Sequence, residues 1–583
     1  MCSFFGIKTD NPELLEFLKN NQEKIFRKLK YRGPDIHRIE QIEKNFILAG
    51  FVLAINDFVP QPIEKDGAWL VWNGEIYNCP KEYSNDSQYL IDLFHNQGTD
   101  VIFNYQDNGN GNLVSEIDGE YTICYYNKGF LHIITDDFFT KPLCYSLTNE
   151  TFIFSSYESA INELDASLPV IHALPNTYYI FDTNSYQLVS QKEVYKWDFE
   201  PRHNTFEFWN QAFEESVKKR INTDKKVFLP LSSGYDSGAI CCEVLRQNFP
   251  CTMYSYLGIE NREILNQRFQ LIAESKNSNS VIVNPRKDFD TNFKEFYEKA
   301  ENFVGYHYDG TPYIDIFNAY SCFAHYLICR EAKQKGYEIC LSGHGSDEIY
   351  SDYYSPNTKS SSTLKGDYTN VRTKWPNFDM GYGRNILGMF ERTAGACGVE
   401  TRYPFLDRNA VQNFLWLSDE LKNSNYKQCL YQLMSARSFP FDNVNFKISL
   451  RIFENDKNNR LFTYYTGRFY RQNNLILPEF IKKIKLRNAN KKLSSKNLGK
   501  SSVDFVKRAR IKEKKGEYQE AISLYRQSIQ SLPNFYLTHQ LLAEVLLKNG
   551  DFMGAISELK IAIKLNPKSL FCQHRLKKLL SNV

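Results

Sequence analysis

Apolar and polar residues alternate over short distances in roughly the first 200 residues, as expected of β-strands. Four short apolar runs are separated by turn-forming residues: Phe46–Val52, Trp69–Trp72, Tyr121–Tyr126 and Phe130–Thr135. Runs of this length between turn signals are typical of strands. This part of the chain is therefore expected to be rich in β-structure.

One helix is expected close to the N-terminus. Asn11-Pro12 favours a helix start, because Pro is well suited to the first helical position. Apolar residues then recur at helical spacing, at Leu14, Leu18, Ile25 and Leu29. Gly33-Pro34 lies beyond the expected end of this helix.

From about residue 205 the pattern changes to strands that alternate with longer helical stretches, which predicts a parallel α/β sheet. Two strand candidates, Val227–Leu231 and Tyr337–Leu341, lead directly into loops rich in Ser and Gly. Parallel sheets bind ligands at the carboxyl ends of their strands. These two loops are therefore candidates for a binding site.

A basic, polar segment over residues 479–502 has little to bury. It reads EFIKKIKLRNANKKLSSKNLGKSS and is interpreted as a solvated linker, with a nucleic-acid arm as the alternative.

An internal repeat follows the linker. Gly516-Glu-Tyr-Gln-Glu-Ala-Ile, which runs on to Pro533, recurs 34 residues later as Gly550-Asp-Phe-Met-Gly-Ala-Ile, which runs on to Pro567. This is the period of the tetratricopeptide repeat, a pair of helices that stacks on its neighbours. Residues 503–583 are therefore expected to form a small all-α module. Protein or peptide docking, structural capping and dimerisation are all open roles for it.

Composition narrows the function classes. The formal net charge is only +3 over 583 residues, which argues against nucleic acid or an anionic membrane as the main partner. No apolar stretch reaches the ~20 residues needed to span a bilayer. The 13 Cys are scattered without CxxC pairs, which favours a reducing cytoplasm over a disulfide framework.

Cys2 is a candidate nucleophile. If the initiator Met is removed, Cys2 becomes the first residue and carries a free α-amine beside its thiol. An amine with a pKa near ~7.7–8.0 can accept the proton of a thiol with a pKa near ~8.5. Nucleophile and base would then belong to one residue.

Four motifs occur in order within the first ninety residues: Cys2-Ser-Phe-Phe-Gly-Ile7, Tyr31-Arg-Gly-Pro-Asp35, Asn73-Gly-Glu-Ile-Tyr-Asn78 and Asp86. Together they resemble the glutaminase domain of class II amidotransferases. The resemblance implies an α+β N-terminal-nucleophile fold of two stacked antiparallel sheets. It also implies that Asn73 and the N–H of Gly74 form an oxyanion hole. Glu75 and Asp86 would bind the α-ammonium of glutamine.

Two positions depart from this family. Val52 stands where the family has an Arg that binds the carboxylate of glutamine, and Ser3 replaces the usual Gly. Loss of a bidentate Arg is expected to weaken glutamine binding by roughly a few kcal/mol unless another cation substitutes.

The loop after the first strand candidate reads Ser232-Ser-Gly-Tyr-Asp-Ser237 and precedes an apolar helix. Its N–H groups and hydroxyls at a helix N-terminus suit a pyrophosphate group. It resembles the SGGxDS loop of ATP pyrophosphatases, with Ser233 in place of the first Gly of that pair. The resemblance assigns Ser232, Gly234, Asp236 and Ser237 to ATP binding. Leu257 and Gly258, which end the next strand candidate, would contact the adenine.

The loop after the second strand candidate reads Leu341-Ser-Gly-His-Gly-Ser-Asp-Glu348 and resembles the SGEGSDE loop of asparagine synthetases. Ser342 and Gly343 would bind ATP, and Asp347 with Asp236 would hold Mg²⁺. The segment Arg392-Thr-Ala-Gly-Ala-Cys-Gly-Val-Glu-Thr-Arg-Tyr-Pro-Phe-Leu-Asp407 matches the long signature of the same family, which ends in ExRxPFLD.

The resemblance covers roughly residues 1–450 and implies three parts. A class II glutaminase domain would occupy residues 2–200, and an α/β parallel-sheet adenylating domain residues 205–475, before the linker and the repeat module. The chemistry implied is ATP-dependent amidation of a carboxylate, with ammonia from glutamine and with AMP and pyrophosphate as products. Aspartate is the default acceptor, and a homodimer is an open possibility.

The acceptor region carries further departures. His344 stands where the family has a Glu that acts beside the acyl-adenylate, and a neutral imidazole there could serve as base. Asp352 replaces a Gly. Lys447, in Lys447-Ile-Ser-Leu-Arg451, is the candidate for the cation that stabilises the pentavalent intermediate.

Three alternatives therefore remain. The acceptor could be specialised, such as a sugar acid, a peptide or a secondary metabolite. The enzyme could be an ATP-dependent cyclase that uses an internal amine, which Val52 favours and the retained Cys2, Asn73, Glu75 and Asp86 oppose. A non-catalytic scaffold that acts through its repeats predicts random damage at both sites, which the intact motifs oppose.

Overall fold

The computed structural model describes residues 2–55, 58–108, 111–256, 260–284, 288–306, 312–354, 362–378, 383–442, 466, 502–531, 536–565 and 570–580. The chain divides into two compact units. One contains residues 1–305 and 314–475, and the other residues 306–313 and 476–583. The expected linker lies outside the described residues from 479 to 501.

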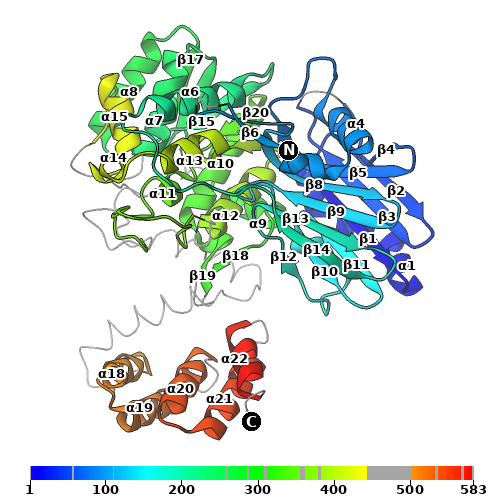
Figure 1. The fold of residues 1–583 in the computed structure, drawn as a ribbon, viewed down its shortest axis with the longest axis vertical. Helices are drawn as coiled ribbons and strands as arrows, with labels where there is room; N and C mark the ends of the chain where they lie inside the picture. The colour runs from blue at the N-terminus through cyan, green and yellow to red at the C-terminus, as the bar shows by residue number, and fades with distance from the viewer. Residues whose placement is uncertain are drawn as a thin grey trace. The chain divides into compact units, whose positions relative to one another are not determined.

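Two six-stranded antiparallel sheets begin the first unit (Figure 1). The first has the order β12-β10-β11-β1-β3-β2, with bounds β1 Ser3–Thr9, β2 Ile36–Glu43, β3 Phe46–Val52, β10 Cys144–Leu147, β11 Thr151–Ser155 and β12 Ile171–His172. The second has the order β14-β13-β9-β8-β5-β4, with bounds β4 Ile63–Lys65, β5 Ala68–Ile76, β8 Gly119–Asn127, β9 Phe130–Thr135, β13 Thr177–Asp182 and β14 Gln187–Glu193. A short ribbon joins β6 Tyr105–Asp107 and β7 Leu113–Ser115.

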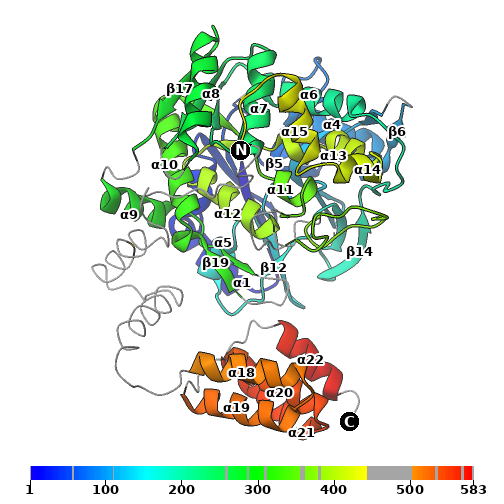
Figure 2. The ribbon, with the colours of Figure 1, turned by 90° about the vertical axis from the view of Figure 1, so that its left-hand side faces the viewer.

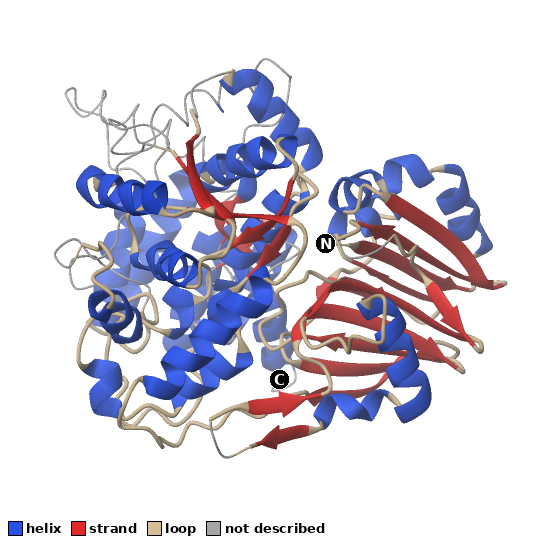
Figure 3. Cartoon of the chain, turned by 90° about the horizontal axis from the view of Figure 1, so that it is seen from above, coloured by secondary structure: helices blue, strands red, loops and turns tan. Residues whose placement is uncertain are grey.

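The two sheets lie as stacked layers with a shared apolar core (Figure 3). Phe4 of β1 and Leu48 of β3 pack in one cluster with Val71 of β5 and Ile133 of β9. Helices cover the outer faces, with bounds α1 Pro12–Asn20, α2 Gln22–Ile25, α3 Arg27–Arg32, α4 Asp86–Gln97, η1 Thr99–Phe103 and α5 Glu158–Leu164. The predicted antiparallel, stacked arrangement is confirmed.

The single N-terminal helix predicted from the sequence is wrong in one respect, because the segment forms three short helices. Asn11 caps α1 as expected, through side-chain bonds from the N–H groups of Glu13 and Leu14. The first helix ends at Asn20, Asn21 separates α1 from α2, and Phe26 separates α2 from α3. Leu18, Ile25 and Leu29 are nevertheless buried against β1 and β3. Tertiary burial of these apolar residues outweighs helical continuity.

A five-stranded parallel sheet forms the rest of this unit, in the order β17-β16-β15-β20-β21. Its strands are β15 Lys226–Pro230, β16 Cys251–Ser255, β17 Ser278–Ile282, β20 Tyr337–Leu341 and β21 Glu400–Arg402. Two further strands are β18 Val304–Tyr306 and β19 Pro312–Asp315. The predicted parallel α/β sheet is confirmed.

Helices lie on both sides of this sheet (Figures 1 and 2). Their bounds are α6 Glu207–Ile221, α7 Tyr235–Arg246, α8 Arg262–Glu274, α9 Phe289–Lys299, η2 Ile316–Asn318, α10 Tyr320–Gln334, α11 Ser346–Ile349, α12 Gly383–Gly395, η3 Pro404–Leu406, α13 Arg408–Leu415, α14 Asp419–Asn423 and α15 Gln428–Ala436. Val227, Leu229 and Leu341 belong to the buried core that the sheet and helices share.

The second unit contains five described helices that pack side by side (Figure 2). Their bounds are α18 Ser502–Lys514, α19 Tyr518–Ser531, α20 Tyr536–Lys548, α21 Phe552–Leu565 and α22 Leu570–Leu580. Ala521 of α19 and Ala555 of α21 are fully buried in its core. None of the described helices of the chain combines the length and the apolar character required to cross a bilayer.

Candidate functional site

Cys2 lies immediately before β1, between β3 and β5. It is buried, and its main-chain nitrogen donates to Asn73 Oδ1 at 2.9 Å. Its carbonyl accepts from Arg32 Nε at 2.9 Å. Burial raises the pKa of the thiol. The backbone of Cys2 is therefore held on both sides, and the thiol needs a nearby base or positive charge to react.

Asn73 on β5 offers a hydrogen-bond donor beside Cys2. Its Oδ1 is occupied by Cys2, while its buried Nδ2 has no hydrogen-bond partner in the described part of the chain. A buried donor without a partner costs free energy unless a ligand accepts from it. Gly74 follows with φ +147°, and a Cβ there would lie 2.0 Å from the carbonyl oxygen of Glu120. Only glycine fits this turn of the strand.

Two carboxyl groups lie on the same side of this region. Glu75 follows Gly74 on β5, and Asp86 is the first residue of α4. Burial, together with the charge of Glu75, raises the pKa of Asp86 well above its ordinary value. Two neighbouring carboxylates repel each other, so one of the pair tends to be protonated. A cationic ligand group would stabilise both carboxylates and displace that proton.

Val52 and Ser3, the two residues that depart from the glutaminase family, are both packed against neighbouring residues. Val52 is buried and packs against Cys2 and Ala54, with Ile36 beside them. The wall next to the nucleophile is therefore apolar at this point. Ser3 is also buried, and its hydroxyl donates to the carbonyl of Leu29 at 2.8 Å. That bond satisfies the polar group that the substitution introduces.

A second half-site lies at the carboxyl ends of β15 and β20. Residues from both loops line a cavity of about 220 Å³: Ser232, Asp236, Ser237, Ser342, Gly343, His344 and Asp347. The loops approach closely, since a Cβ on Gly343 would lie 3.0 Å from Cβ of Asp236. Gly234 is the N-cap of α7 and donates to Ser232 Oγ at 3.1 Å. The residues that the two motifs nominate are thus brought together.

Three nominated residues, Leu257, Gly258 and Lys447, lie outside the described residues. Tyr256, which precedes the first two, lines the cavity.

Lys427 is a residue that the sequence analysis missed. It is buried, and its Nζ pairs with Asp236 and lies 2.9 Å from Asp347 Oδ1. It precedes α15 with a φ of +44°. Lys427-Gln-Cys-Leu430 has the same Lys-x-x-Leu spacing that singled out Lys447, so the signal was present in the sequence.

The pair Asp236 and Asp347 fits a hard divalent cation. One ammonium group contacts both carboxylates, so a cation can bridge them. Mg²⁺ prefers one or two protein carboxylates and completes its shell with water and phosphate oxygens. No group of three or more His, Cys, Asp or Glu side chains gathers as a metal site in the described ranges. The donor set therefore suits a metal that arrives with a phosphate substrate.

His344 is one of the residues that line the cavity. Its Nδ1 is 2.6 Å from Ser342 Oγ, and its ring centroid is 4.1 Å from that of Phe390. Burial lowers the pKa of His344 to about 4. The imidazole is therefore neutral near pH 7 and bonds a hydroxyl group instead of backbone. Tyr256, Ile328 and Phe390 add apolar surface to the cavity.

Ser233 and Asp352, which replace glycines of the family motifs, both form hydrogen bonds with their side chains. Ser233 does not adopt a positive φ, and its N–H and hydroxyl both donate to Glu260 Oε2, the former at 2.6 Å. Asp352 has a φ of +46° and is fully buried. Its carboxylate accepts from the N–H groups of Thr363 and Leu364 and from Asn377 Nδ2. Asp352 therefore holds Thr363, Leu364 and Asn377 in place through its carboxylate.

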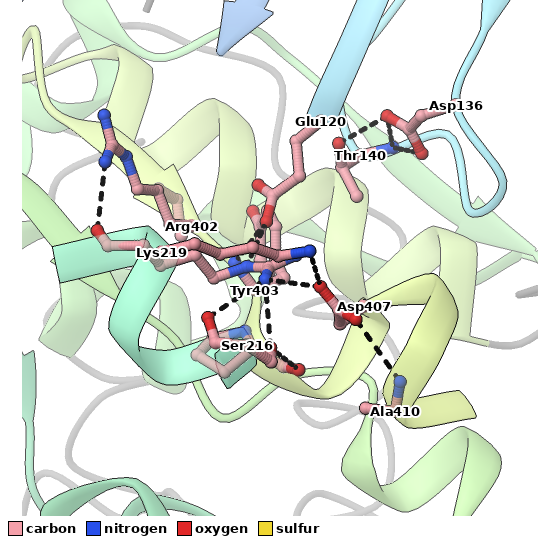
Figure 4. A network of polar contacts seen from close by, with 12 residues as sticks. Glu120, Asp136, Thr140, Ser216, Lys219, Arg402, Tyr403, Asp407 and Ala410 are labelled. Atoms are coloured by element: carbon pink, nitrogen blue, oxygen red, sulfur yellow. Dashed lines mark hydrogen bonds and ion pairs between the residues drawn. The ribbon is translucent and has the colours of Figure 1, made fainter. Parts of the chain in front are cut away.

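The signature segment 400–407 joins the antiparallel sheets to the parallel sheet. Glu120 of β8 accepts from the N–H of Tyr403 at 2.8 Å and pairs with Arg220 at 2.8 Å. Asp407 pairs with Arg220 and Lys219. Figure 4 shows Glu120 reaching from its strand toward this segment. These charges are buried but fully paired, as buried ions must be.

Comparison with known proteins also separates the region of the antiparallel sheets from the region of the parallel sheet. Residues 1–197 match the glutamine amidotransferase domain family, and residues 209–378 match the asparagine synthase family. Along the chain, a stretch similar to glutamine amidotransferase domains is thus followed by a stretch similar to asparagine synthases. In domain order it is asparagine-synthetase-like.

Three curated relatives match the chain at low identity. A protein of Methanocaldococcus jannaschii, whose name as a glutamine-hydrolysing asparagine synthetase is itself provisional, is 24% identical and covers 77% of this chain and 87% of its own. The glutamine-hydrolysing asparagine synthetase of Rattus norvegicus is 23% identical over 68% of this chain and 74% of its own. An asparagine synthetase domain-containing protein of Saccharomyces cerevisiae is 24% identical over 69% of this chain and 85% of its own.

Proposed function

We propose that this protein forms an amide from a carboxylate, with ATP as activating substrate and glutamine as ammonia donor. The observation that carries the proposal is the unpartnered Nδ2 of Asn73 beside Cys2. The bridging arrangement of Asp236 and Asp347 supports the second half-reaction. Aspartate is the default acceptor, which would make asparagine the product.

The first half-reaction is hydrolysis of glutamine at Cys2. After removal of Met1 the nitrogen that Asn73 Oδ1 holds would be the α-amine, and it would accept the thiol proton. The thiolate attacks the side-chain amide, and Asn73 Nδ2 with the N–H of Gly74 donates to the resulting oxyanion. The protonated α-amine of Cys2 gives its proton to the departing nitrogen, ammonia leaves, and water then releases glutamate from the thioester. Glu75 and Asp86 bind the α-ammonium of the substrate.

The second half-reaction is adenylation. The acceptor carboxylate attacks the α-phosphorus of ATP, pyrophosphate leaves, and an acyl-adenylate forms. Ser232, Gly234 and Ser237 would hold phosphate oxygens at the N-terminus of α7, with Ser342 and Gly343 facing them. Asp236 and Asp347 would hold Mg²⁺, which neutralises the phosphate charge. Lys427, which contacts both carboxylates, would turn its charge to the phosphates.

Amide formation completes the cycle. Ammonia from Cys2 reaches the acyl-adenylate through the interior, attacks the acyl carbon and displaces AMP. An enclosed route keeps ammonia neutral until it reacts. Lys447 stays the proposed cation for the pentavalent intermediate. His344 would accept a proton from the attacking nitrogen as a weak base, because its pKa of about 4 is low.

A specialised acceptor is a second candidate. The described wall of the cavity near His344 is aromatic and aliphatic, with Phe390 against the imidazole. Such a wall favours an acceptor with an apolar body over a small, doubly charged amino acid. A cyclase with an internal amine remains an alternative, supported by Val52 beside Cys2.

The C-terminal module is proposed to be a tetratricopeptide pair that docks a protein or peptide. Gly516 and Gly550, at equivalent repeat positions, have φ values of +77° and +83°. The helices that follow them, α19 and α21, both have 14 residues. Structural capping and dimerisation are the other uses of such a pair.

Product analysis tests the proposed function. The purified protein is incubated with ATP, Mg²⁺, aspartate and either glutamine or ammonium, and products are identified by mass spectrometry. We expect asparagine with equal amounts of AMP and pyrophosphate. Product from ammonium alone would mean that Val52 has disabled glutamine use. Glutamate without asparagine would mean another acceptor, and no turnover of either substrate would favour the scaffold.

Glutamine binding should strengthen as pH rises. The raised pKa of Asp86 means that the ligand-free protein holds a proton there, which an incoming ammonium displaces. Affinity then rises up to about tenfold per pH unit below that pKa and levels off above it. Calorimetry with the Cys2→Ala variant isolates binding from chemistry. In Cys2→Ala/Asp86→Asn binding should be weaker and independent of pH, and a flat profile with Asp86 present would contradict the shared proton.

A further inference from the structure

Arg402 contacts both half-sites, Glu75 through its side chain and Ser342 through its main chain. It ends β21, and its position on that strand is fixed by pairing with Leu341 of β20. The N–H of Ser342 donates to the carbonyl of Arg402 at 2.9 Å. The main chain of Arg402 therefore sets where the loop of Ser342, Gly343 and His344 begins.

The side chain of Arg402 reaches in the other direction. Its Nη2 lies 3.2 Å from Glu75 Oε2, across the boundary with the antiparallel sheets. Nε donates to Glu400 Oε1 at 2.8 Å, and Nη1 donates to the carbonyl of Arg220 at 3.0 Å. The Arg402 side chain is 1% exposed and is held by these three contacts. Its planar fork transmits position as well as charge.

The neighbouring residue makes a parallel link to the nucleophile. The Tyr403 hydroxyl donates to Glu391, whose other oxygen pairs with Arg32 Nη2 at 2.6 Å. Arg32 in turn holds the carbonyl of Cys2. Figure 4 shows Arg402 and Tyr403 beside Glu120 of the antiparallel sheet. Two consecutive residues are thus connected to the Cys2 site, Arg402 through its ion pair with Glu75 and Tyr403 through Glu391 and Arg32.

We propose that Arg402 is a positioning residue of the glutamine site, supplied by the adenylating half of the chain, and that it couples the two sites. It orients Glu75 for the substrate ammonium while its main chain holds the 342–348 loop. This rests on the proposed function. A ligand that moves Glu75 shifts β21 and that loop, and by linkage a ligand at the loop changes glutamine affinity to the same extent.

Arg402→Lys tests this role, because it keeps the charge and removes the fork. Three quantities are measured: KM and kcat for glutamine hydrolysis, product formation from ammonium, and the change in glutamine KM when ATP and acceptor are added. We expect glutamine KM to rise about tenfold or more, because the substitution breaks a buried ion pair that holds Glu75. The ammonium reaction should stay within about threefold, and the effect of ATP on KM should vanish.

Arg408→Lys is the matched control. Arg408 is also buried and also crosses between the two halves, where it pairs with Asp137 at 2.7 and 2.9 Å, but it contacts neither site. It should leave glutamine KM unchanged even if it lowers the melting temperature. Glu75→Gln removes the same Arg402–Glu75 ion pair from the Glu75 side, and it leaves no unpaired carboxylate on β5. It should raise KM similarly, and the double variant should add less than the two single effects together.

Three results would overturn the role of Arg402. One is a change in glutamine KM of less than about twofold in Arg402→Lys, and another is an equal loss of the glutamine and ammonium reactions, which indicates a purely structural residue. The third is a wild-type protein that uses ammonium but hydrolyses no glutamine, which leaves the adenylating half of the proposed function standing. No product from either nitrogen source would instead remove the proposed function and this role with it.

Discussion

Replacing Cys2 by Ala is expected to abolish glutamine-dependent product formation while ammonium-dependent formation continues. The thiol is the only group that the proposed mechanism uses to attack glutamine, so hydrolysis should fall by about 1,000-fold or more. The adenylating half-site is built from other residues, chiefly around Asp236 and Asp347. Glutamate release and amide formation, measured separately with each nitrogen source, check this expectation.

A buried cysteine of the first sheet provides the control. Cys144 on β10 is buried to the same degree or more but takes no part in the Cys2 site. Cys144→Ala should keep both reactions. Undiminished glutamine hydrolysis in Cys2→Ala would assign the chemistry to another group and remove the first half of the proposed function.

Replacing Lys427 by Met is expected to damage both ATP use and stability. Lys427 contacts Asp236 and Asp347, whose side chains are 31% and 23% exposed. Without it these carboxylates repel each other, which should lower the free energy of unfolding by about 1–3 kcal/mol, less than for a fully buried pair. ATP affinity should fall at least about tenfold, because a cation beside the phosphates is lost.

Mg²⁺ should restore part of the lost stability in Lys427→Met. A divalent cation that binds the two carboxylates of the folded state stabilises that state by mass action. Thermal unfolding with and without Mg²⁺, together with ATP binding by calorimetry, measures both effects. Lys422→Met is the control, since Lys422 is buried nearby but donates to the carbonyl of Leu415. Equal behaviour of the two variants would show that Lys427 has no special relation to the site.

The local pattern of apolar runs and turn residues was enough to predict these strands. The predicted runs Phe46–Val52, Phe130–Thr135 and Tyr337–Leu341 coincide with β3, β9 and β20. Short apolar runs between turn signals leave few other ways to bury their side chains. The prediction of one continuous N-terminal helix was wrong because its outcome depends on contacts that are distant in sequence. Its apolar spacing is correct, but contact with β1 and β3 decides where the chain bends, and that contact is not local.

The candidate site divides in the same way. Motif order nominated Cys2, Asn73, Asp236 and Asp347, and the structure brings the first pair together and the second pair together. Lys427 was missed because it lies 80 residues beyond Asp347 in a segment whose motif resembles another one, at Lys447. Only the packing of α15 against α7 carries it to the carboxylates.

By itself, the sequence predicted the two sheet types and the order of the parts, and its resemblance to a family nominated the groups at each half-site. These depend on residue type and on spacing within short segments, which chain neighbours alone control. The tertiary structure decided that Arg402 reaches Glu75 and that Tyr403 is linked through Glu391 to Arg32. The Arg402–Glu75 and Glu391–Arg32 contacts each join residues more than 300 positions apart, and only the packing of one sheet system against the other brings such charges within hydrogen-bonding distance.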